Sequence, residues 1–317
     1  MQSTYITSIY VNDYRIVMPN KKQTEQKVSI RFYKDHEVRA AWDGDNNKWW
    51  FSVLDIIGVM NEQDDYAKNR NYWKYLKTKL KRENNELVSA TNQLKMQASD
   101  GKRYKTDVVD NEGIILLAKN FPNNKAVDFL DWFTYSDNTI DGQSRKKAYS
   151  LFESELINSI SEGTVEGLLQ IHAFLFGGLY DFAGQIRTVN IAKGGFQFAM
   201  AQYLPQTLSD IERMPENSLD EIVDKYVEMN IAHPFREGNG RATRIWLDIM
   251  LKNRLKQCVD WSKIDKNDYL DAMMHSVTNA SRIKQLIANA LTDRIADREI
   301  FMKGIDYSYY YEQVDDE

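Results

Sequence analysis

Residues 138–317 consist almost entirely of segments whose apolar residues recur with a spacing near 3.6, and this constrains the fold more than any other feature. Such spacing predicts amphipathic helices. They are expected at Tyr149–Ile160, Gly167–Leu175, Gln206–Met214, Leu219–Ile231, Gly240–Leu255, Asp268–His275 and Ser281–Leu291. The exception is residues 185–198, where Gly194 and Gly195 can close a β-hairpin. The sequence thus predicts an all-helical domain that carries one hairpin.

Residues 1–137 have a mixed pattern, typical of a small α+β domain. Alternation at 28–33 and the aromatic run 48–51 predict two strands that form a β-hairpin, and 101–106 predicts another strand. Helices are expected at 53–60, with Ser52 as N-cap, at 111–118 and at 125–135. The polar stretch 137–142 is the predicted linker. The fold class is therefore mainly α, a helical domain 138–317 preceded by an α+β domain 1–137.

Composition excludes several classes of protein. Of 317 residues, 43% are hydrophobic and 27% are charged, as in globular proteins. A single cysteine, Cys258, rules out an internal disulfide and favours a reducing compartment, so a cytoplasmic protein is expected. No apolar run approaches the roughly 20 residues that a membrane-spanning helix needs.

Charge is divided unevenly between the halves. Residues 1–137 contain 21 Lys+Arg and 19 Asp+Glu, which leaves 41 − 21 = 20 basic and 46 − 19 = 27 acidic residues in 138–317. Within the first half, Lys68–Arg82 holds seven basic residues and no acidic one, with Tyr72, Trp73 and Tyr75 interleaved. This strip fits a nucleic-acid backbone, or equally a solvated helix face whose aromatics turn into the core.

The segment from His233 to Arg244 combines residue types that suit phosphate chemistry. Histidine can accept a proton near neutral pH, and the Glu237 carboxylate can hold a hard cation such as Mg²⁺. Gly238, Asn239 and Gly240 can turn backbone N–H groups toward an anion at the start of a helix. Arg241 and Arg244 then lie one turn apart and can grip phosphate oxygens.

The surroundings of His233 follow from its neighbours. Pro234 disfavours helical geometry in the residue before it, so the preceding helix ends at His233. At a helix C-terminus the dipole favours the protonated imidazole. Asn230 lies three residues earlier on the same face and is expected to reach the same space.

The segment resembles the signature of the Fic family, HxFx(D/E)GNGRxxR. All eight specified positions match, namely His233, Phe235, Glu237, Gly238, Asn239, Gly240, Arg241 and Arg244. The resemblance extends over about 138–317, with Gly177–Arg187 and Ile191–Phe196 similar to the family's helix end and flap hairpin. It implies a protein adenylyltransferase, in which a hydroxyl attacks the α-phosphate of ATP and AMP stays on a Tyr, Ser or Thr of a target protein.

The resemblance also implies a role for each matching residue. His233 takes the hydroxyl proton, and Glu237 holds Mg²⁺ between the α- and β-phosphates. Gly238 to Gly240 steady the α-phosphate, while Arg241 holds the β-phosphate. Asn230, and Lys193 in the flap, are expected to meet the nucleotide.

Ser308 to Glu312 resembles the family's inhibitory motif, placed C-terminally as in its third class. The two residues are four apart and are expected on one helical face, with Glu312 paired to Arg244, the arginine for the γ-phosphate. The predicted consequence is autoinhibition by a displaceable helix. Tyr309, Tyr310 and Tyr311 would become targets of self-modification once this helix detaches.

The first half resembles the N-terminal domain of phage antirepressors, Bro-N, through Ile30–Phe32, Trp50–Ile57 and Tyr72–Leu80. This resemblance implies DNA binding and gives a second hypothesis, a DNA-binding regulator whose Fic half uses another nucleotide or phosphate donor. Removal of AMP is a further chemical alternative. The target, the release signal and the oligomeric state stay open, a homo-oligomer included.

Overall fold

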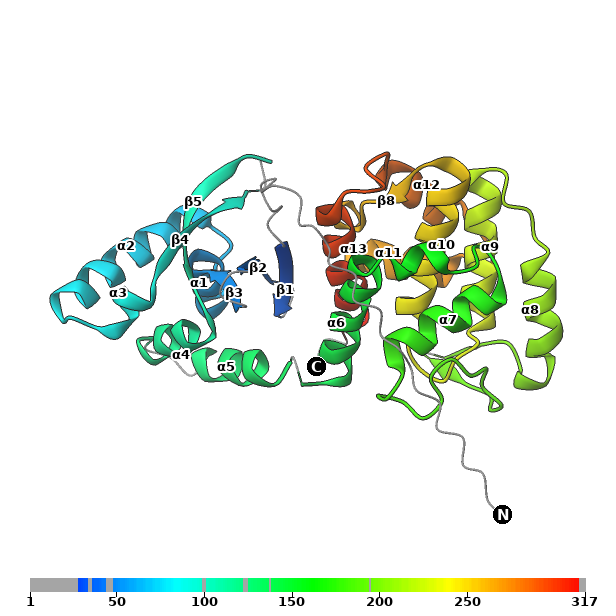
Figure 1. The fold of residues 1–317 in the computed structure, drawn as a ribbon, viewed down its shortest axis with the longest axis horizontal. Coiled ribbons are helices and arrows are strands. Elements are labelled where there is room, and N and C mark those ends of the chain that lie inside the picture. The colour runs from blue at the N-terminus through cyan, green and yellow to red at the C-terminus, as the bar shows by residue number, and fades with distance from the viewer. Residues whose placement is uncertain are drawn as a thin grey trace, which may run out of the picture.

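The computed structural model describes residues 28–33, 36–43, 48–98, 101–121, 125–136, 138–193 and 195–313. They form a small sheet-containing domain and a larger helical domain, with the helix α13 at their junction (Figure 1). The predicted fold class is confirmed. None of the helices in these ranges is long and apolar enough to cross a membrane.

The first domain is built on a five-stranded antiparallel sheet in the order β1-β2-β3-β5-β4. Its strands are β1 (Val28–Tyr33), β2 (His36–Asp43), β3 (Lys48–Ser52), β4 (Asn92–Gln97) and β5 (Arg103–Val109). The expected hairpin of 28–33 with 48–51 was wrong, because β2 lies between them and pairs with both. Strand β2 escaped prediction since its buried apolar residues, Val38, Ala40 and Ala41, are few and small.

Helices cover this sheet and bury its core. They are α1 (Val53–Asn61), α2 (Tyr66–Arg82), α3 (Glu86–Ala90), α4 (Asn111–Lys119) and α5 (Lys125–Ser136). The Ser52 side chain accepts from the Asp55 N–H, so the predicted N-cap of α1 is confirmed. Ile56 and Ile57 of α1 are fully buried and anchor this helix between the sheet and α5.

The second domain is helical, as predicted. Its helices are α6 (Ile140–Glu153), α7 (Val165–Phe176), α8 (Leu204–Glu212), α9 (Leu219–Ala232), α10 (Asn239–Leu255), α11 (Lys266–His275), α12 (Ser281–Ala290) and α13 (Arg298–Tyr310), with short 3₁₀ turns η1 (Leu156–Ser159), η2 (Ala201–Tyr203) and η3 (Trp261–Lys263). Two-residue strands form the pairs β6 (Ala192–Lys193) with β7 (Phe196–Gln197) and β8 (Cys258–Val259) with β9 (Leu291–Thr292).

Two boundaries differ from the predictions. The helix expected at 149–160 breaks at Glu155, whose φ is 58°, in the left-handed region. The linker expected at 137–142 is shorter, because Thr139 caps α6 through the Gly142 N–H and the helix begins at Ile140. The connection between the domains is therefore a few residues long.

Helix α10 forms the centre of the second domain. Trp246, Leu247 and Met250 are fully buried, and α10 packs on α9 and α7. Because α10 is held from several sides, its first turn has a fixed position against the end of α9. This is the place where the His233–Arg244 segment lies.

Candidate active site

The loop between α9 and α10 begins with His233, which ends α9 as Pro234 predicts. The His233 backbone has φ 49° and ψ 63°, and its N–H donates to the Met229 carbonyl at 3.0 Å. A left-handed conformation is costly for a residue with a side chain, and such strain concentrates at functional sites. The turn directs the imidazole back along the end of α9.

The His233 ring is held in one tautomer. Its Nδ1 lies 3.1 Å from the Asn230 carbonyl oxygen, which can only accept, so Nδ1 carries the proton and Nε2 keeps its lone pair. The ring stacks on Phe198, with centroids 3.7 Å apart. Burial lowers the pKa of His233 to about 4, although the Asn230 carbonyl and Glu312 oppose this shift. The expectation of a protonated imidazole was wrong, because loss of water outweighs the helix dipole.

Arg187 fixes this loop and was missed in the sequence. Its Nε donates to the His233 carbonyl at 2.7 Å, its Nη1 to the Val189 carbonyl at 2.7 Å, and its Nη2 to the Ala232 and Ala199 carbonyls. The side chain is 3% exposed. One guanidinium therefore joins the end of α9 to both ends of the flap segment 189–199. Only its place in the segment 177–187 could have drawn attention to it.

The first turn of α10 begins without a side-chain cap. Gly238 is the N-cap with φ 82°, and no side chain caps this helix end. A Cβ on Gly238 would overlap the Phe176 ring, so glycine is required both for the conformation and for the space. The Asn239 side chain accepts from the Phe235 N–H and donates to the Phe235 carbonyl, each at 2.8 Å. Asn239 thus shapes the loop with its side chain and offers its backbone N–H to a ligand.

His172 supports the same loop from α7. It accepts from the Gly184 N–H at Nδ1, so its Nε2 carries the proton and donates to the Glu237 carbonyl at 2.9 Å. Its ring stacks on Phe235, with centroids 3.7 Å apart. Burial lowers the pKa of His172 to about 4. His172 is fully buried and positions the loop that carries Glu237.

Both arginines of the segment are paired with carboxylates. Arg241 Nη2 lies 2.7 Å from Glu237 Oε1, and Arg241 Nη1 pairs with Asp141 from the first turn of α6. Arg244 Nη2 lies 2.5 Å from Glu312 Oε1, and its Nε donates to the Ser308 hydroxyl at 2.7 Å. Asp141 was not singled out in the sequence, since it lies 100 positions from Arg241.

Glu312 occupies the space in front of the first turn of α10. A Cβ on Gly240 would overlap Glu312 Oε1, so the carboxylate lies against the open helix end. Burial raises the pKa of Glu312, but the charges of Arg244 and Arg241 lower it more, and the pKa stays below its usual value. Helix α13 ends at Tyr310, so Glu312 follows the helix in a turn and does not share a helical face with Ser308. A carboxylate thus stands where an anionic ligand would bind.

The flap contributes Lys193 from β6. Its side chain is exposed, and its positive charge lowers the pKa of both His233 and Glu312. The predicted hairpin within 185–198 is confirmed by the pairing of Lys193 with Phe196. Asn230 reaches His233 through its carbonyl oxygen. The predicted residues are therefore gathered around one end of α10.

Glu237 is the candidate metal ligand. Its side chain is 55% exposed, and Oε1 accepts from the Gly238 N–H at 2.9 Å. Among the described residues no group of three or more His, Cys, Asp or Glu could hold a metal by itself. One carboxylate fits Mg²⁺, which is commonly held by one or two carboxylates together with substrate phosphates and water.

Comparison with known families decides what these two domains are. Residues 162–251 match the family described as Fic/DOC. They form a Fic domain. Residues 37–140 match the N-terminal domain of the BRO family, so a Bro-N domain precedes the Fic domain, as the sequence predicted.

Relatives of the Fic domain carry names that describe one activity. The chain is 30% identical over 150 residues to "Protein adenylyltransferase VbhT" of Bartonella schoenbuchensis, a match over 43% of this chain and 31% of that protein. It is 28% identical over 149 residues to "Probable protein adenylyltransferase Fic" of Salmonella typhimurium, over 44% and 68% of the two chains. The chain thus spans about a third of the first relative. Among solved structures, BepC of Bartonella tribocorum with bound AMPPNP is similar at a TM-score of 0.40 and 20% identity, over 48% and 84% of the two chains.

Proposed function

We propose that the Fic domain is a protein adenylyltransferase that transfers AMP from ATP to a hydroxyl side chain of a target protein. The observation that carries this proposal is the arrangement of a neutral imidazole, an uncapped helix end and two arginines around one space. The names of its relatives support the same activity.

The neutral tautomer of His233 suits a general base. Its Nε2 would accept the proton as the hydroxyl oxygen bonds to the α-phosphorus, while the bond from that phosphorus to the β-phosphate breaks and pyrophosphate leaves. General-base catalysis of this kind contributes about 10²–10⁴-fold in rate. The backbone N–H groups at Gly238–Gly240 and the guanidinium of Arg241 would stabilise the charge on the phosphates.

Glu237 would hold Mg²⁺, which would supply charge neutralisation for the phosphates of ATP. Arg241 would leave its carboxylate partners and bind the β-phosphate, since it lies one turn from Gly238. Lys193 adds positive charge above His233. The flap would bind the target by strand addition, which reads its backbone more than its side chains.

The contact of Glu312 with Arg244 supports an autoinhibited ground state. As long as Glu312 engages Arg244, this arginine is withheld from the γ-phosphate, and the carboxylate repels the triphosphate from the end of α10. Displacement of the segment 308–312 would activate the enzyme. Tyr309 and Tyr311 are 4% and 2% exposed, so self-modification of either would require this displacement.

The test compares wild type, Glu312→Gly and the double variant Glu312→Gly/His233→Ala. Each full chain is incubated with labelled ATP, GTP, CTP or UTP in a lysate, and labelled protein is measured. We expect strong labelling from ATP with Glu312→Gly, weak labelling with wild type and none with the double variant. Equal labelling by the single and double variants would refute the role of His233, and labelling from another nucleotide alone would refute ATP.

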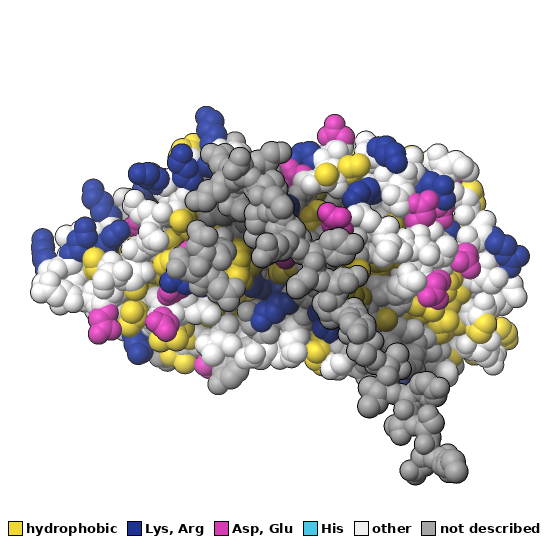
Figure 2. Space-filling view, in the orientation of Figure 1, with side chains coloured by type: hydrophobic (Ala, Val, Ile, Leu, Met, Phe, Trp, Pro, Cys, Tyr) yellow, Lys and Arg dark blue, Asp and Glu magenta, His cyan; other side chains and the backbone are white. Residues whose placement is uncertain are grey.

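A second function, binding of nucleic acid by the Bro-N domain, is favoured by its surface. Basic side chains gather on this end of the molecule, over α2 and the β4–β5 arm (Figure 2). On α2, Lys74, Lys79, Lys81 and Arg82 are exposed and Tyr75 is 74% exposed, while Trp73 is buried. Of these two aromatic side chains on α2, Trp73 therefore packs into the core and Tyr75 faces solvent. Binding of a labelled oligonucleotide that weakens steeply with salt would support this function.

A further inference from the structure

Strand β1 is the edge of the Bro-N sheet, and α13 of the Fic domain covers this edge. The Ile30 N–H donates to Asp306 Oδ2 at 2.7 Å in a buried contact. Asp306 also accepts from the Tyr149 hydroxyl on α6. An edge strand normally presents unpaired backbone groups, and here a helix of the other domain satisfies one of them. The first domain thus forms a direct hydrogen bond with the helix that precedes Glu312.

Aromatic side chains of β1 and α13 also pack together, close to Glu312. Phe32 stacks on Tyr310 with centroids 4.2 Å apart and meets Tyr307 edge-on at 4.9 Å. The Tyr307 hydroxyl donates to Glu37 of β2. Tyr310 is two residues from Glu312. We call this set the clamp, formed by Ile30, Phe32 and Glu37 on the sheet and Asp306, Tyr307 and Tyr310 on the helix.

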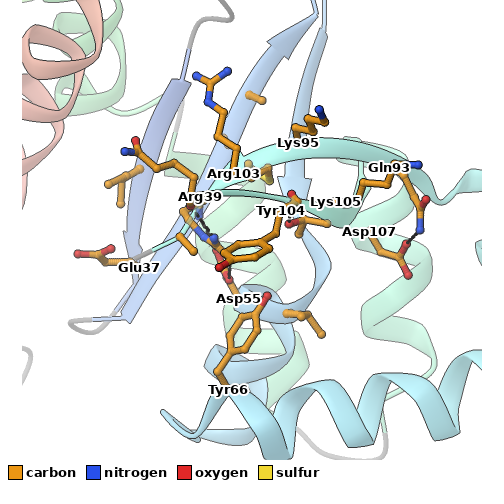
Figure 3. Close-up of a pocket in the computed structure, with 18 of the residues that line it drawn as sticks. Glu37, Arg39, Asp55, Tyr66, Gln93, Lys95, Arg103, Tyr104, Lys105 and Asp107 are labelled. Atoms are coloured by element: carbon orange, nitrogen blue, oxygen red, sulfur yellow. Dashed lines mark hydrogen bonds and ion pairs between the residues drawn. The ribbon is translucent and has the colours of Figure 1, made fainter. Parts of the chain in front are cut away.

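A cleft of about 990 Å³ lies beside the clamp. Ile30 and Glu37 of the clamp line it, and so do Glu299 and Lys303 of α13. Arg39, Tyr66 and the hairpin of β4 and β5 also line it (Figure 3). A ligand in this cleft would therefore contact the sheet and the helix that the clamp joins.

The charges in the cleft define its ligand. Lys95 and Lys105 are directly opposite each other on β4 and β5, with Arg103 two positions away. All three are exposed and have no ion-pair partner among the described residues, although like charges in opposite positions repel. All five lining acids already have partners: Asp55 and Asp107 pair with Arg39 and Lys77, Asp64 with His36 and Glu299 with Lys303, while Glu37 accepts from the Tyr307 hydroxyl. An added anion would relieve the repulsion.

Exposed aromatics narrow the choice among anions. Tyr66 and Tyr104 line the cleft and are 42% and 49% exposed. Basic groups interleaved with exposed rings are typical of surfaces that bind single-stranded nucleic acid, where bases stack and phosphates meet cations. Duplexes offer no free base faces to such rings.

We propose that single-stranded nucleic acid binds in this cleft and loosens the clamp, which lifts Glu312 from Arg244. Phosphates beside Glu37 and Glu299 would repel these carboxylates and attract Lys303 away from Glu299, to which it is paired at 2.9 Å. This regulation rests on the proposed AMP transfer and on its proposed inhibition by Glu312. Nucleic acid is then the signal, and the Bro-N domain is its sensor.

The test uses full-length wild type, Glu312→Gly, Phe32→Ala, Tyr307→Phe, Lys95→Gln/Lys105→Gln and Tyr33→Ala. Tyr33 is the matched control, because it follows Phe32 on β1 but packs on Phe129 and Trp132 within its own domain. Labelled AMP incorporation and oligonucleotide binding are measured, together with hydrogen exchange of the α13 amides, with single-stranded and with duplex DNA.

We expect the single strand to raise wild-type labelling roughly 5- to 150-fold, the usual range of coupling between sites. It should also speed hydrogen exchange in α13, and the double lysine variant should lose both responses. Phe32→Ala and Tyr307→Phe should label without DNA, whereas Tyr33→Ala should behave as wild type. The milder Tyr307→Phe keeps the ring and serves if Phe32→Ala does not fold.

Two results would overturn the proposal, namely absence of binding to the single strand, or binding that leaves α13 exchange unchanged. A response to duplex alone would overturn the choice of ligand. If Glu312→Gly gains no labelling while α13 exchange still responds to DNA, the proposed AMP transfer fails and the coupling stands. If Glu312→Gly is active but Phe32→Ala and Tyr307→Phe stay as inactive as wild type, the clamp fails.

Discussion

Arg244 Nη2 and Glu312 Oε1 lie 2.5 Å apart, although 68 positions separate the two residues in the chain. The arginine side chain is 3% exposed and the glutamate side chain 21% exposed. A buried guanidinium without a partner is costly, so this pair stabilises the fold and, in the proposed function, also withholds Arg244 from a ligand.

Replacement of Glu312 by Gln tests this double role. The amide keeps the shape but removes the charge, while Arg244 retains its contacts with Ser308 and Tyr269. We expect a loss of about 1–3 kcal/mol in the free energy of unfolding and a larger stabilisation by ATP than in wild type. Thermal unfolding with and without ATP measures both. Identical melting temperatures and identical ATP shifts would contradict the prediction.

The lowered pKa of His233 predicts the acid side of the activity profile. Because the pKa of His233 is about 4, the imidazole stays unprotonated at pH values far below its ordinary pKa near 6.5. Removal of Glu312 lowers this pKa further, since the carboxylate favours the charged ring. Transfer by Glu312→Gly should therefore be level from pH 8 to about 5 and fall only in stronger acid. A decline centred near pH 6.5 would show that His233 titrates normally.

The same shift predicts how stability depends on pH. His172 and His233 both have a pKa of about 4 in the fold and near 6.5 when unfolded. Between these values the unfolded chain binds more protons, so stability is complete above pH 6.5 and is lost as the pH falls toward 4. His172→Phe should make this slope shallower in urea unfolding at several pH values. An unchanged slope would show that His172 does not contribute to the pH dependence of stability.

Arg187→Lys should impair catalysis through the position of His233. An ammonium cannot satisfy the His233, Val189, Ala199 and Ala232 carbonyls together. We expect a loss of roughly 10–100-fold in kcat in the Glu312→Gly background, since small displacements of a catalytic group cost about this much. The KM for ATP should change little. A fall in ATP affinity with normal kcat would assign Arg187 to binding.

Gly238→Ala should destabilise the loop. The φ of 82° and the overlap with Phe176 act together, and overpacking alone costs about 1–3 kcal/mol. Gly178→Ala is the matched control, because its φ is 75° but a Cβ there meets nothing within 4 Å. Denaturant unfolding should show the larger loss for Gly238. Equal losses would mean that the left-handed backbone conformation alone causes the destabilisation and that the overlap with Phe176 contributes nothing.

Much of this molecule could be predicted because it follows from local rules. Helical spacing located α7 to α12 within a few residues, and Ser52 marked the start of α1. Pro234 placed the end of α9 at His233. The eight positions that match the Fic signature predicted that Arg241, Arg244 and Glu237 lie together at the first turn of α10. Each of these signals lies within a short stretch of sequence.

The remainder depends on contacts between distant segments. Strand β2 is defined by its neighbours β1 and β3, and Arg187 by four carbonyls on other segments. The pKa of His233 was predicted with the wrong sign, because burial is not visible in the sequence. The contact between Ile30 and Asp306 spans 276 positions, and no periodicity could reveal it.

The cover that α13 provides for β1 has a consequence for damaged chains. A chain cut or terminated before Arg298 would lose Glu312 and, with it, the proposed inhibition. The same loss would uncover Ile30 and Phe32 at an open sheet edge, and open edges recruit other strands. If the proposed inhibition holds, the same truncation that activates the enzyme is therefore expected to expose a sheet edge that favours aggregation.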